Sequence, residues 1–277
     1  MAARRVLVTG GAGNVAGWLA RTAPVGVDLH VTGHRTPVPE DVASVASVHP
    51  VDLRRGDEVS ELLGRVRPDV VLHTAYVQSE REAIIDATRE VALGAASVGA
   101  SMVHMSTDVV FSGTGPPYGE EAEPDPVTDY GRWKLESERM VGQIAADVCI
   151  TRTSLVVSLD PMDRSTATFA RDLGSGDGAT MFTDEMRQPI RAEDLASELW
   201  ALVALDRSDR AGVWHLPGPE HLSRQELGER LAARLGLDPA GMRAARAADV
   251  APGRPRDPQL TSRRRRRLGV RLRPVDA

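Results

Sequence analysis

Short apolar runs alternate with amphipathic stretches along the first half of the chain. The strands predicted around these runs cover residues 4–9, 27–32, 70–73, 101–105 and 148–153. Stretches between them, such as residues 56–67, repeat apolar side chains at helical spacing. Continuous apolar runs are typical of strands buried on both faces, and strands that alternate with helices favour parallel pairing. The pattern therefore predicts an α/β fold with a Rossmann-type doubly wound parallel sheet.

The pattern becomes less regular after residue 154. Two amphipathic stretches, residues 192–205 and 223–235, have helical spacing, but no second glycine-rich nucleotide motif occurs. We expect residues 1–154 to form a dinucleotide-binding domain. Residues 155–277 are expected to form mainly a smaller substrate-binding region, with some segments returning to the first domain.

The composition is that of a globular protein with no bulk preference for nucleic acid. Hydrophobic residues make up 42% of the sequence, charged residues 26%, and the formal net charge is -5. We interpret the basic run at residues 263–267 as a solvated helix end rather than a nucleic-acid patch. Cys149 is the only cysteine, which excludes an intrachain disulfide and a cysteine-rich metal site. The sequence also contains no compact carboxylate cluster that would indicate a metal site.

The amino-terminal sequence leads directly into the first apolar run. This run is too short for a signal peptide or a membrane span, and no later segment reaches about 18 uninterrupted apolar residues. We therefore expect a cytoplasmic protein without membrane contact. The single cysteine agrees with a reducing compartment.

A glycine-rich turn follows the first predicted strand at residues 10–17 and precedes an apolar helical stretch. Glycine lets the backbone approach a pyrophosphate closely, and the helix N-terminus then favours the negative charge. We therefore expect a dinucleotide cofactor that contacts Gly10, Gly13, Asn14 and Val15.

The end of the second predicted strand indicates which dinucleotide is bound. An acidic residue at this position would bond the ribose 2′-hydroxyl of NAD, whereas an arginine suits the 2′-phosphate of NADP. The strand ends in Gly33, His34 and Arg35, with no acid. Arg35 therefore favours NADP, used as NADPH, over NAD.

The ends of the next two strands are expected to complete the cofactor site. A third strand is predicted at residues 44–49, and a fourth ends at His73. We interpret His73 as a hydrogen-bonded core residue rather than a ligand or base. The expected cofactor contacts after these strands are Asp52, Leu53, Thr74, Ala75 and Tyr76.

Tyr130 and Lys134 lie one turn apart on a predicted helix and share a face. A neighbouring ammonium favours the phenolate form of tyrosine and brings its pKa closer to a working pH. Thr107 ends a predicted strand at the edge where doubly wound sheets bind ligands, so its hydroxyl can meet a substrate carbonyl. Hydride delivery to a carbonyl leaves an alkoxide, which needs a donor already in place. The three residues together predict a reductive site.

Motifs distributed over most of the chain resemble those of the extended short-chain dehydrogenase/reductases, and within them the dTDP-4-dehydrorhamnose reductase group. They lie at residues 8–13, 67–71, 106–111, 130–134, 191–196, 212–216, 222–227 and 254–257. The resemblance implies that Tyr130 donates a proton to a carbonyl oxygen and that Thr107 hydrogen-bonds the same oxygen. Lys134 would hold the nicotinamide ribose, and the step needs no metal. The oligomeric state stays open; relatives often pair through long helices, so the helices at 80–98 and 129–144 are the candidate surface for a homodimer.

The resemblance also leaves two alternatives. The chain is similar to the beta regulatory subunit of methionine adenosyltransferase, which implies a non-catalytic NADP-binding protein that acts through a partner. An NAD-dependent sugar-nucleotide epimerase or dehydratase would share the same fold. Retention of Thr107, Tyr130 and Lys134 favours an enzyme, and Arg35 argues against NAD.

The substrate is expected to be a small carbonyl compound. Members of the resembling group commonly carry tyrosine at the position of Val109 and an aromatic residue near Leu155, whereas both residues are aliphatic here. A pocket without the hydroxyl and the ring suits a sugar nucleotide less well. A nucleotide sugar and another ketone or aldehyde therefore both stay open. The expected substrate contacts are Ser106, Asp108, Val109, Leu155 and Arg187.

Overall fold

The computed structural model describes residues 4–277, so residues 1–3 of the amino-terminal stretch lie outside the described residues. Its centre is a seven-stranded parallel sheet with the strand order β11-β6-β5-β4-β1-β2-β3. The strands are β1 (Arg4–Thr9), β2 (Val27–Gly33), β3 (Ser47–Pro50), β4 (Val70–His73), β5 (Ser101–Thr107), β6 (Cys149–Thr153) and β11 (Gly212–Leu216). The predicted α/β doubly wound fold is confirmed.

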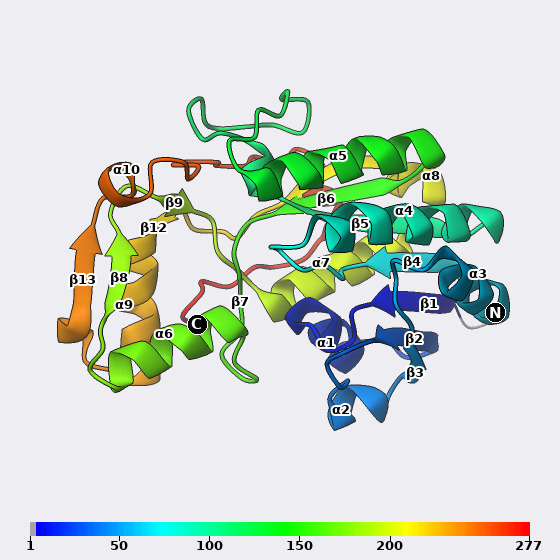
Figure 1. Ribbon diagram of the computed structural model, residues 1–277, viewed down its shortest axis with the longest axis horizontal. Coiled ribbons are helices and arrows are strands. Elements are labelled where there is room, and N and C mark those ends of the chain that lie inside the picture. The colour runs from blue at the N-terminus through cyan, green and yellow to red at the C-terminus, as the bar shows by residue number, and fades with distance from the viewer. Residues whose placement is uncertain (1–3) are drawn as a thin grey trace.

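Helices cover both faces of this sheet (Figure 1). The two that pack together on one face are α1 (Asn14–Arg21) and α7 (Ala192–Ala204). The other face carries α3 (Gly56–Val66), α4 (Arg81–Ser97) and α5 (Asp129–Ile144), while α2 (Glu40–Ala43) and α8 (Arg207–Arg210) are short connecting helices.

Alternation along β1 explains why the sheet needs both layers. Val6 and Val8 belong to the core beneath α1 and α7, whereas Leu7 belongs to the core beneath α3 and α4. Successive side chains of a strand point to opposite faces, so an uninterrupted apolar run must be covered on each side. Val6, Leu7 and Val8 are all at most 1% exposed.

A smaller group of elements follows β6 and has its own core of Val157, Leu222, Leu227, Leu231 and Val275. Its strands form three pairs, β7 with β10, β9 with β12, and β8 with β13. The elements are β7 (Val156–Val157), α6 (Arg164–Gly174), β8 (Ala179–Phe182), β9 (Met186–Arg187), β10 (Ile190–Arg191), β12 (Leu222–Ser223), α9 (Arg224–Leu235), β13 (Met242–Ala245) and α10 (Ala247–Val250). The carboxyl ends of β1 and β4 face this group (Figure 1).

The later part of the chain returns to the large sheet. β11 pairs with β6 and completes one edge, and α7 packs against α1. Trp214 of β11 is fully buried in the core of the large sheet. No helix among residues 4–277 is long and apolar enough to cross a membrane.

The basic run at residues 263–267 is not simply solvated. The guanidinium carbon of Arg264 lies 4.1 Å from the centroid of the Trp214 ring. Arg265, the first residue of the 3₁₀ helix η3 (Arg265–Leu268), forms an ion pair of 2.5 Å with the buried Glu198. The solvated-end interpretation holds for the exposed Arg266 and is wrong for Arg264 and Arg265, whose cations anchor the chain.

Candidate active site

The predicted catalytic side chains come together where β5 ends and α5 begins. Thr128 caps α5, because its hydroxyl oxygen accepts from the N–H of Gly131 at 3.1 Å. A Cβ at Gly131 would overlap the carbonyl oxygen of Val109, in the 3₁₀ turn η1 (Asp108–Val110). Glycine at 131 therefore allows the close approach that brings Tyr130 to the carboxyl end of β5.

Lys134 is the only lysine in the sequence, whose other basic residues are all arginine. Its side chain is buried, and Nζ donates a 2.8 Å hydrogen bond to the carbonyl oxygen of Met105 in β5. Nζ also lies 5.0 Å from the centroid of the Tyr76 ring. Burial lowers the Lys134 pKa to about 8, although Glu138 acts in the opposite direction. A compact ammonium suits this enclosed place, whereas a guanidinium is larger and does not lose its proton.

Tyr130 stacks on Tyr76, with ring centroids 5.9 Å apart. Burial, followed by the charge and hydrogen bonding of Tyr76 and the charge of Asp108, raises the Tyr130 pKa well above its usual value, while hydrogen bonding with Thr107 lowers it. The expected stabilisation of the phenolate by Lys134 is therefore wrong for this arrangement. The Lys134 ammonium bonds the Met105 carbonyl and lies over the Tyr76 ring, and burial is the largest effect on the Tyr130 pKa. Tyr130 stays a protonated phenol at neutral pH.

Thr107 and Asp108 form a polar pair beside the phenol. The Thr107 hydroxyl donates to Asp108 Oδ1 at 3.2 Å, and the N–H of Val109 donates to Thr107 Oγ1 at 3.3 Å. Burial raises the Asp108 pKa, and Arg187, Ser154 and Thr107 offset part of the increase.

The glycine-rich turn has the shape of a dinucleotide cradle. Gly10 has φ +77°, and a Cβ there would lie 3.0 Å from the Cβ of Ala75. Gly13 occupies the N-cap position of α1 without any side-chain cap, and the first turn of the helix has no acidic residue. Asn14 and Val15 begin the helix. Its N-terminal amide groups are thus available to an anion such as a pyrophosphate.

The hydroxyl of Thr9, the last residue of β1, holds the segment that follows β4. Thr9 Oγ1 accepts from the N–H groups of Thr74 and Ala75 at 3.0 and 3.1 Å and lies 2.9 Å from His73 Nδ1. His73 Nε2 contacts the hydroxyl of Thr88 at 3.0 Å, and burial lowers the His73 pKa to about 3. His73 is therefore a neutral, hydrogen-bonded core residue, as predicted.

The expected ribose and adenine side of the cradle carries more positive charge than the sequence indicated. Arg35 and His34 are both exposed at the end of β2. Asp52 lies 3.8 Å from His34 and is held by Arg54 through bonds of 2.9 and 2.6 Å. Arg54 was not among the predicted site residues, although it directly follows the predicted Asp52 and Leu53 in the sequence. Leu53 is half-buried against the core beneath α3 and α4.

The predicted substrate residues are placed differently from one another. Ser106 is buried at the end of β5, and its hydroxyl has no partner among the described residues. Leu155 packs with the core of the smaller group. Arg187 is 5% exposed, pairs with Glu185 at 3.1 Å and donates to the Pro255 carbonyl at 3.0 Å. Its guanidinium is therefore bonded within the protein, and its contact with a substrate stays a prediction.

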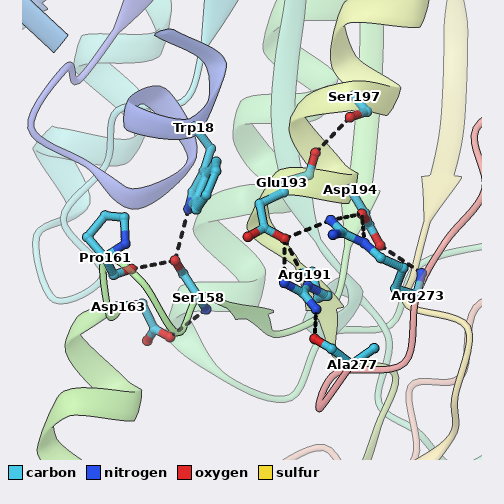
Figure 2. A network of polar contacts seen from close by, with 10 residues as sticks. All are labelled: Trp18, Ser158, Pro161, Asp163, Arg191, Glu193, Asp194, Ser197, Arg273 and Ala277. Carbon is cyan, nitrogen blue, oxygen red and sulfur yellow. Dashed lines mark hydrogen bonds and ion pairs between the residues drawn. The ribbon is translucent and has the colours of Figure 1, made fainter. Parts of the chain in front are cut away.

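Two networks join the cofactor-side helices to the rest of the chain (Figure 2). Trp18 of α1 donates through Nε1 to Ser158 Oγ at 2.9 Å, and the N–H of Ser158 donates to Asp163 at 2.9 Å. In the second network, Arg273 bonds both Asp194 and Glu193 at the start of α7. These contacts tie α1 and α7 to segments that follow β7. Sequence reasoning identified only the motif at residues 191–196, and not its partners.

Residues 4–275 match the family described as the RmlD substrate binding domain. The chain belongs to this family. The predicted resemblance to the extended short-chain dehydrogenase/reductases is thereby confirmed at the family level.

Individual relatives differ in their functions. Methionine adenosyltransferase 2 subunit beta of Xenopus tropicalis is 29% identical over 228 residues, which cover 76% of this chain and 68% of the relative. The structure of dTDP-4-dehydrorhamnose reductase from Bacillus anthracis in complex with NADP has a TM-score of 0.80 at 19% identity, covering 99% of this chain and 96% of that one. The Bordetella bronchiseptica enzyme WbmH in complex with NAD⁺ has a TM-score of 0.81 at 16% identity, covering 99% and 95%. These two structures share the fold.

Proposed function

We propose that the protein is an NADPH-dependent reductase of a ketone or aldehyde. The observation that supports it best is the convergence of the Thr107 hydroxyl, the Tyr130 phenol and the buried Lys134 ammonium at the carboxyl end of β5. In this proposal Tyr130 donates a proton to the carbonyl oxygen and Thr107 hydrogen-bonds that oxygen. The raised pKa of Tyr130 supports the direction of transfer, since a proton donor must be protonated before the step.

The cofactor assignment rests on the cradle and its basic rim. Gly10 and Gly13 would leave room for a pyrophosphate at the N-terminus of α1. The exposed Arg35 at the end of β2 would supply a cation for a 2′-phosphate, with Arg54, which is paired with Asp52, as a further candidate. Bound NADPH would supply the hydride. Lys134 would contact the nicotinamide ribose while it stays hydrogen-bonded to Met105. The RmlD relative from Bacillus anthracis was crystallised with NADP, which supports this choice.

The acceptor is proposed as a small carbonyl compound, with a nucleotide sugar as one member of the class. Membership of the RmlD substrate binding domain family supports a sugar-nucleotide reductase or a related reductase. Val109 and Leu155 would offer apolar contacts in place of a hydroxyl and a ring, and Arg187 is engaged by Glu185. These three features favour an acceptor smaller or less polar than a nucleotide sugar.

A regulatory role is the second candidate, because the chain is 29% identical to methionine adenosyltransferase 2 subunit beta of Xenopus tropicalis. In that case the chain would bind NADP and a partner enzyme without turning over a carbonyl. An NAD-dependent epimerase or dehydratase is a third candidate, which tightly bound NAD and no net cofactor oxidation would reveal. The catalytic side chains favour the reductase, since a scaffold needs none of them.

The proposal is tested by NADPH oxidation with a panel of 4-keto-6-deoxysugar nucleotides, simple ketones and aldehydes. We expect turnover of at least one acceptor by the natural protein, and a loss of about 10²- to 10⁴-fold in kcat for Tyr130→Phe with NADPH binding retained. Tyr118→Phe is the matched control, because Tyr118 stacks on Phe111 at 4.2 Å and lies in another cluster. Equal rates for Tyr130→Phe and the natural protein would refute the assignment. NADPH binding without turnover, together with co-purification of a methionine adenosyltransferase, would support the regulatory role instead.

A further inference from the structure

Asp108 has two carboxylate oxygens that are each bonded to a different hydroxyl group. The residue follows Thr107 directly and is 3% exposed. Oδ1 accepts from Thr107 Oγ1 at 3.2 Å, and Oδ2 accepts from Ser154 Oγ at 2.6 Å. The proposed reduction assigns a task to Thr107 and none to Asp108.

Ser154 fixes which oxygen of Asp108 can carry a proton. The backbone N–H of Gln188 donates to Ser154 Oγ at 3.1 Å. A hydroxyl has one hydrogen to donate, and the short contact to Oδ2 is the place where the Ser154 hydrogen goes. If Oδ2 carried the proton, the Ser154 hydrogen would have to turn away, and no other described residue accepts it. Oδ1, which faces Thr107, is therefore the favoured place for a proton on Asp108.

The same reasoning applies to the Thr107 hydroxyl, which has one hydrogen and two lone pairs. One lone pair accepts from the N–H of Val109 at 3.3 Å. When Asp108 is ionised, the Thr107 hydrogen points to Oδ1 and cannot reach a substrate. When Oδ1 is protonated, its hydrogen occupies the second lone pair of Thr107. The hydrogen of Thr107 is then released toward the site, where Tyr130 is also within hydrogen-bonding reach.

We propose that Asp108 is a positioning residue whose proton on Oδ1 decides whether the Thr107 hydroxyl donates a hydrogen bond to the substrate carbonyl oxygen. The inference rests on the proposed reductase function, because only a carbonyl acceptor would use that hydrogen bond. Together with Asp108 and Thr107, Ser154 and the Gln188 amide form this proton-controlled switch, called the device below. They keep the proton on the side of the carboxyl group that faces the reacting atoms.

Several charged or titratable groups face Asp108 and set the pH at which the device changes state. Arg187 of β9 favours the carboxylate, whereas burial favours the carboxylic acid, and Tyr130 of α5 is the neighbouring acid across the site. Burial is the largest of these effects, so the Asp108 pKa lies above the ordinary carboxyl value. Raising the pH through that pKa removes the hydrogen bond from Thr107 to the substrate. The reductive rate is therefore expected to fall along this part of the pH profile.

The first test compares pH profiles of kcat for the natural protein and Asp108→Asn. An asparagine amide accepts from Ser154 through oxygen and donates to Thr107 through nitrogen, which imitates the protonated carboxyl group permanently. We expect kcat of the natural protein to fall about 10²-fold over the pH range in which Asp108 ionises, in line with the loss of one oxyanion donor. This falling limb of the pH profile should be absent from the variant. Asp125→Asn is the matched control, because the Asp125 side chain bonds only Ser112. An unchanged limb in Asp108→Asn would overturn the proposal.

The second test needs no turnover. The sequence has three tyrosines, so ¹³Cζ-tyrosine labelling gives three signals, and Tyr130→Phe identifies one of them. We expect the Tyr130 signal to shift with an inflection in the carboxyl range in the natural protein and in Asp125→Asn, and to show none in Asp108→Asn. No inflection in the natural protein would contradict the device. An inflection that Asp108→Asn removes, without turnover of any carbonyl, would support the device and reject the reductase function.

Discussion

Lys134 and Met105 are joined by a buried hydrogen bond of 2.8 Å, which the Lys134 ammonium donates to the backbone carbonyl oxygen of Met105 in β5. The bond anchors the only lysine of the chain to the strand that carries Thr107. It also shows why the ammonium does not turn the Tyr130 phenol into a phenolate. The ammonium is bonded to the sheet, and the phenol experiences mainly burial.

Lys134 is expected to reduce the stability of the fold at neutral pH. Its pKa of about 8 in the folded state lies below the unfolded value of about 10.4, so the unfolded chain binds more protons between these limits. The free energy of unfolding should rise as the pH increases from about 8 to about 10. Lys134→Met should raise it at pH 7 by about 1–3 kcal/mol and abolish reduction.

The single lysine makes this measurable without assignment. A ¹³Cε-lysine spectrum has one side-chain signal, whose titration gives the Lys134 pKa directly. Urea unfolding at several pH values gives the stability. A titration near 10.4 would contradict the prediction, and so would a destabilised Lys134→Met.

Gly131→Ala should separate α5 from the turn that follows β5. A Cβ at this position overlaps the Val109 carbonyl oxygen, so the helix must shift away and carry Tyr130 with it. We expect a loss of about 1–3 kcal/mol in stability. The fold decrease in kcat should be larger than the fold change in KM. Gly142→Ala in the same helix meets nothing within 4 Å and should stabilise by about 0.5–1 kcal/mol. Thermal unfolding of both variants checks the contrast, and similar effects at the two positions would argue against it.

Arg35→Ala should change the choice of dinucleotide. An exposed arginine that bonds a 2′-phosphate contributes a charge-assisted hydrogen bond, so its loss should raise the Kd for NADPH about ten- to a hundredfold. The Kd for NADH should stay the same, because NADH lacks that phosphate. Calorimetric titration with both cofactors measures the difference, and Arg89→Ala on the exposed side of α4 is the control. Equal losses for NADPH and NADH would show that Arg35 does not contact the 2′-phosphate.

Arg265→Met should lower the free energy of unfolding, because it removes the partner of the buried Glu198 carboxylate. The Glu198 side chain has no exposed surface, and Arg265 neutralises it through bonds of 2.5 and 2.7 Å. Removing the arginine leaves a buried carboxylate unpaired, which costs about 3–5 kcal/mol. Burial already raises the Glu198 pKa, and Arg265 opposes that increase. Without Arg265 the folded pKa rises further, so the variant should lose stability more steeply than the natural protein as the pH rises from acid to neutral.

Urea unfolding between pH 5 and 8 checks this pH dependence. Arg266→Met is the control, because Arg266 is exposed in the same basic run. It should change stability by no more than about 0.5 kcal/mol. A matching loss in both variants would mean that Arg265 acts through general charge rather than through Glu198.

The central sheet could be predicted because its strands are buried on both faces and leave a continuous apolar pattern. β3 was the least accurate of them: it spans Ser47–Pro50 rather than residues 44–49. It is a mostly exposed edge strand, so burial does not constrain its residues. α6 and the pair β8 and β13 were not predicted, because contacts far away in the sequence stabilise them.

The candidate site, like the fold, could be predicted from the sequence only where local spacing determines it. Tyr130 and Lys134 are four residues apart, so helical geometry alone places them on one face. The capture of Arg187 by Glu185 and by the Pro255 carbonyl involves a partner 68 residues away, which no local pattern contains. The same holds for Ser154 and Asp108, which are 46 residues apart. Local periodicity indicates which residues face the crevice, but long-range packing decides which of them are free to act.

The segment that follows Arg256 bonds both the loop before α5 and the residue next to β9. Tyr118, in the loop that leads to α5, exchanges backbone bonds of 2.8 Å with Gln259 and Thr261. The N–H of Leu260 between them donates at 2.7 Å to the side chain of Gln188, next to β9. Moving the loop before Tyr130 away from the residue next to β9 would therefore break hydrogen bonds to this segment. The three bonds couple the position of that loop to the smaller group of elements.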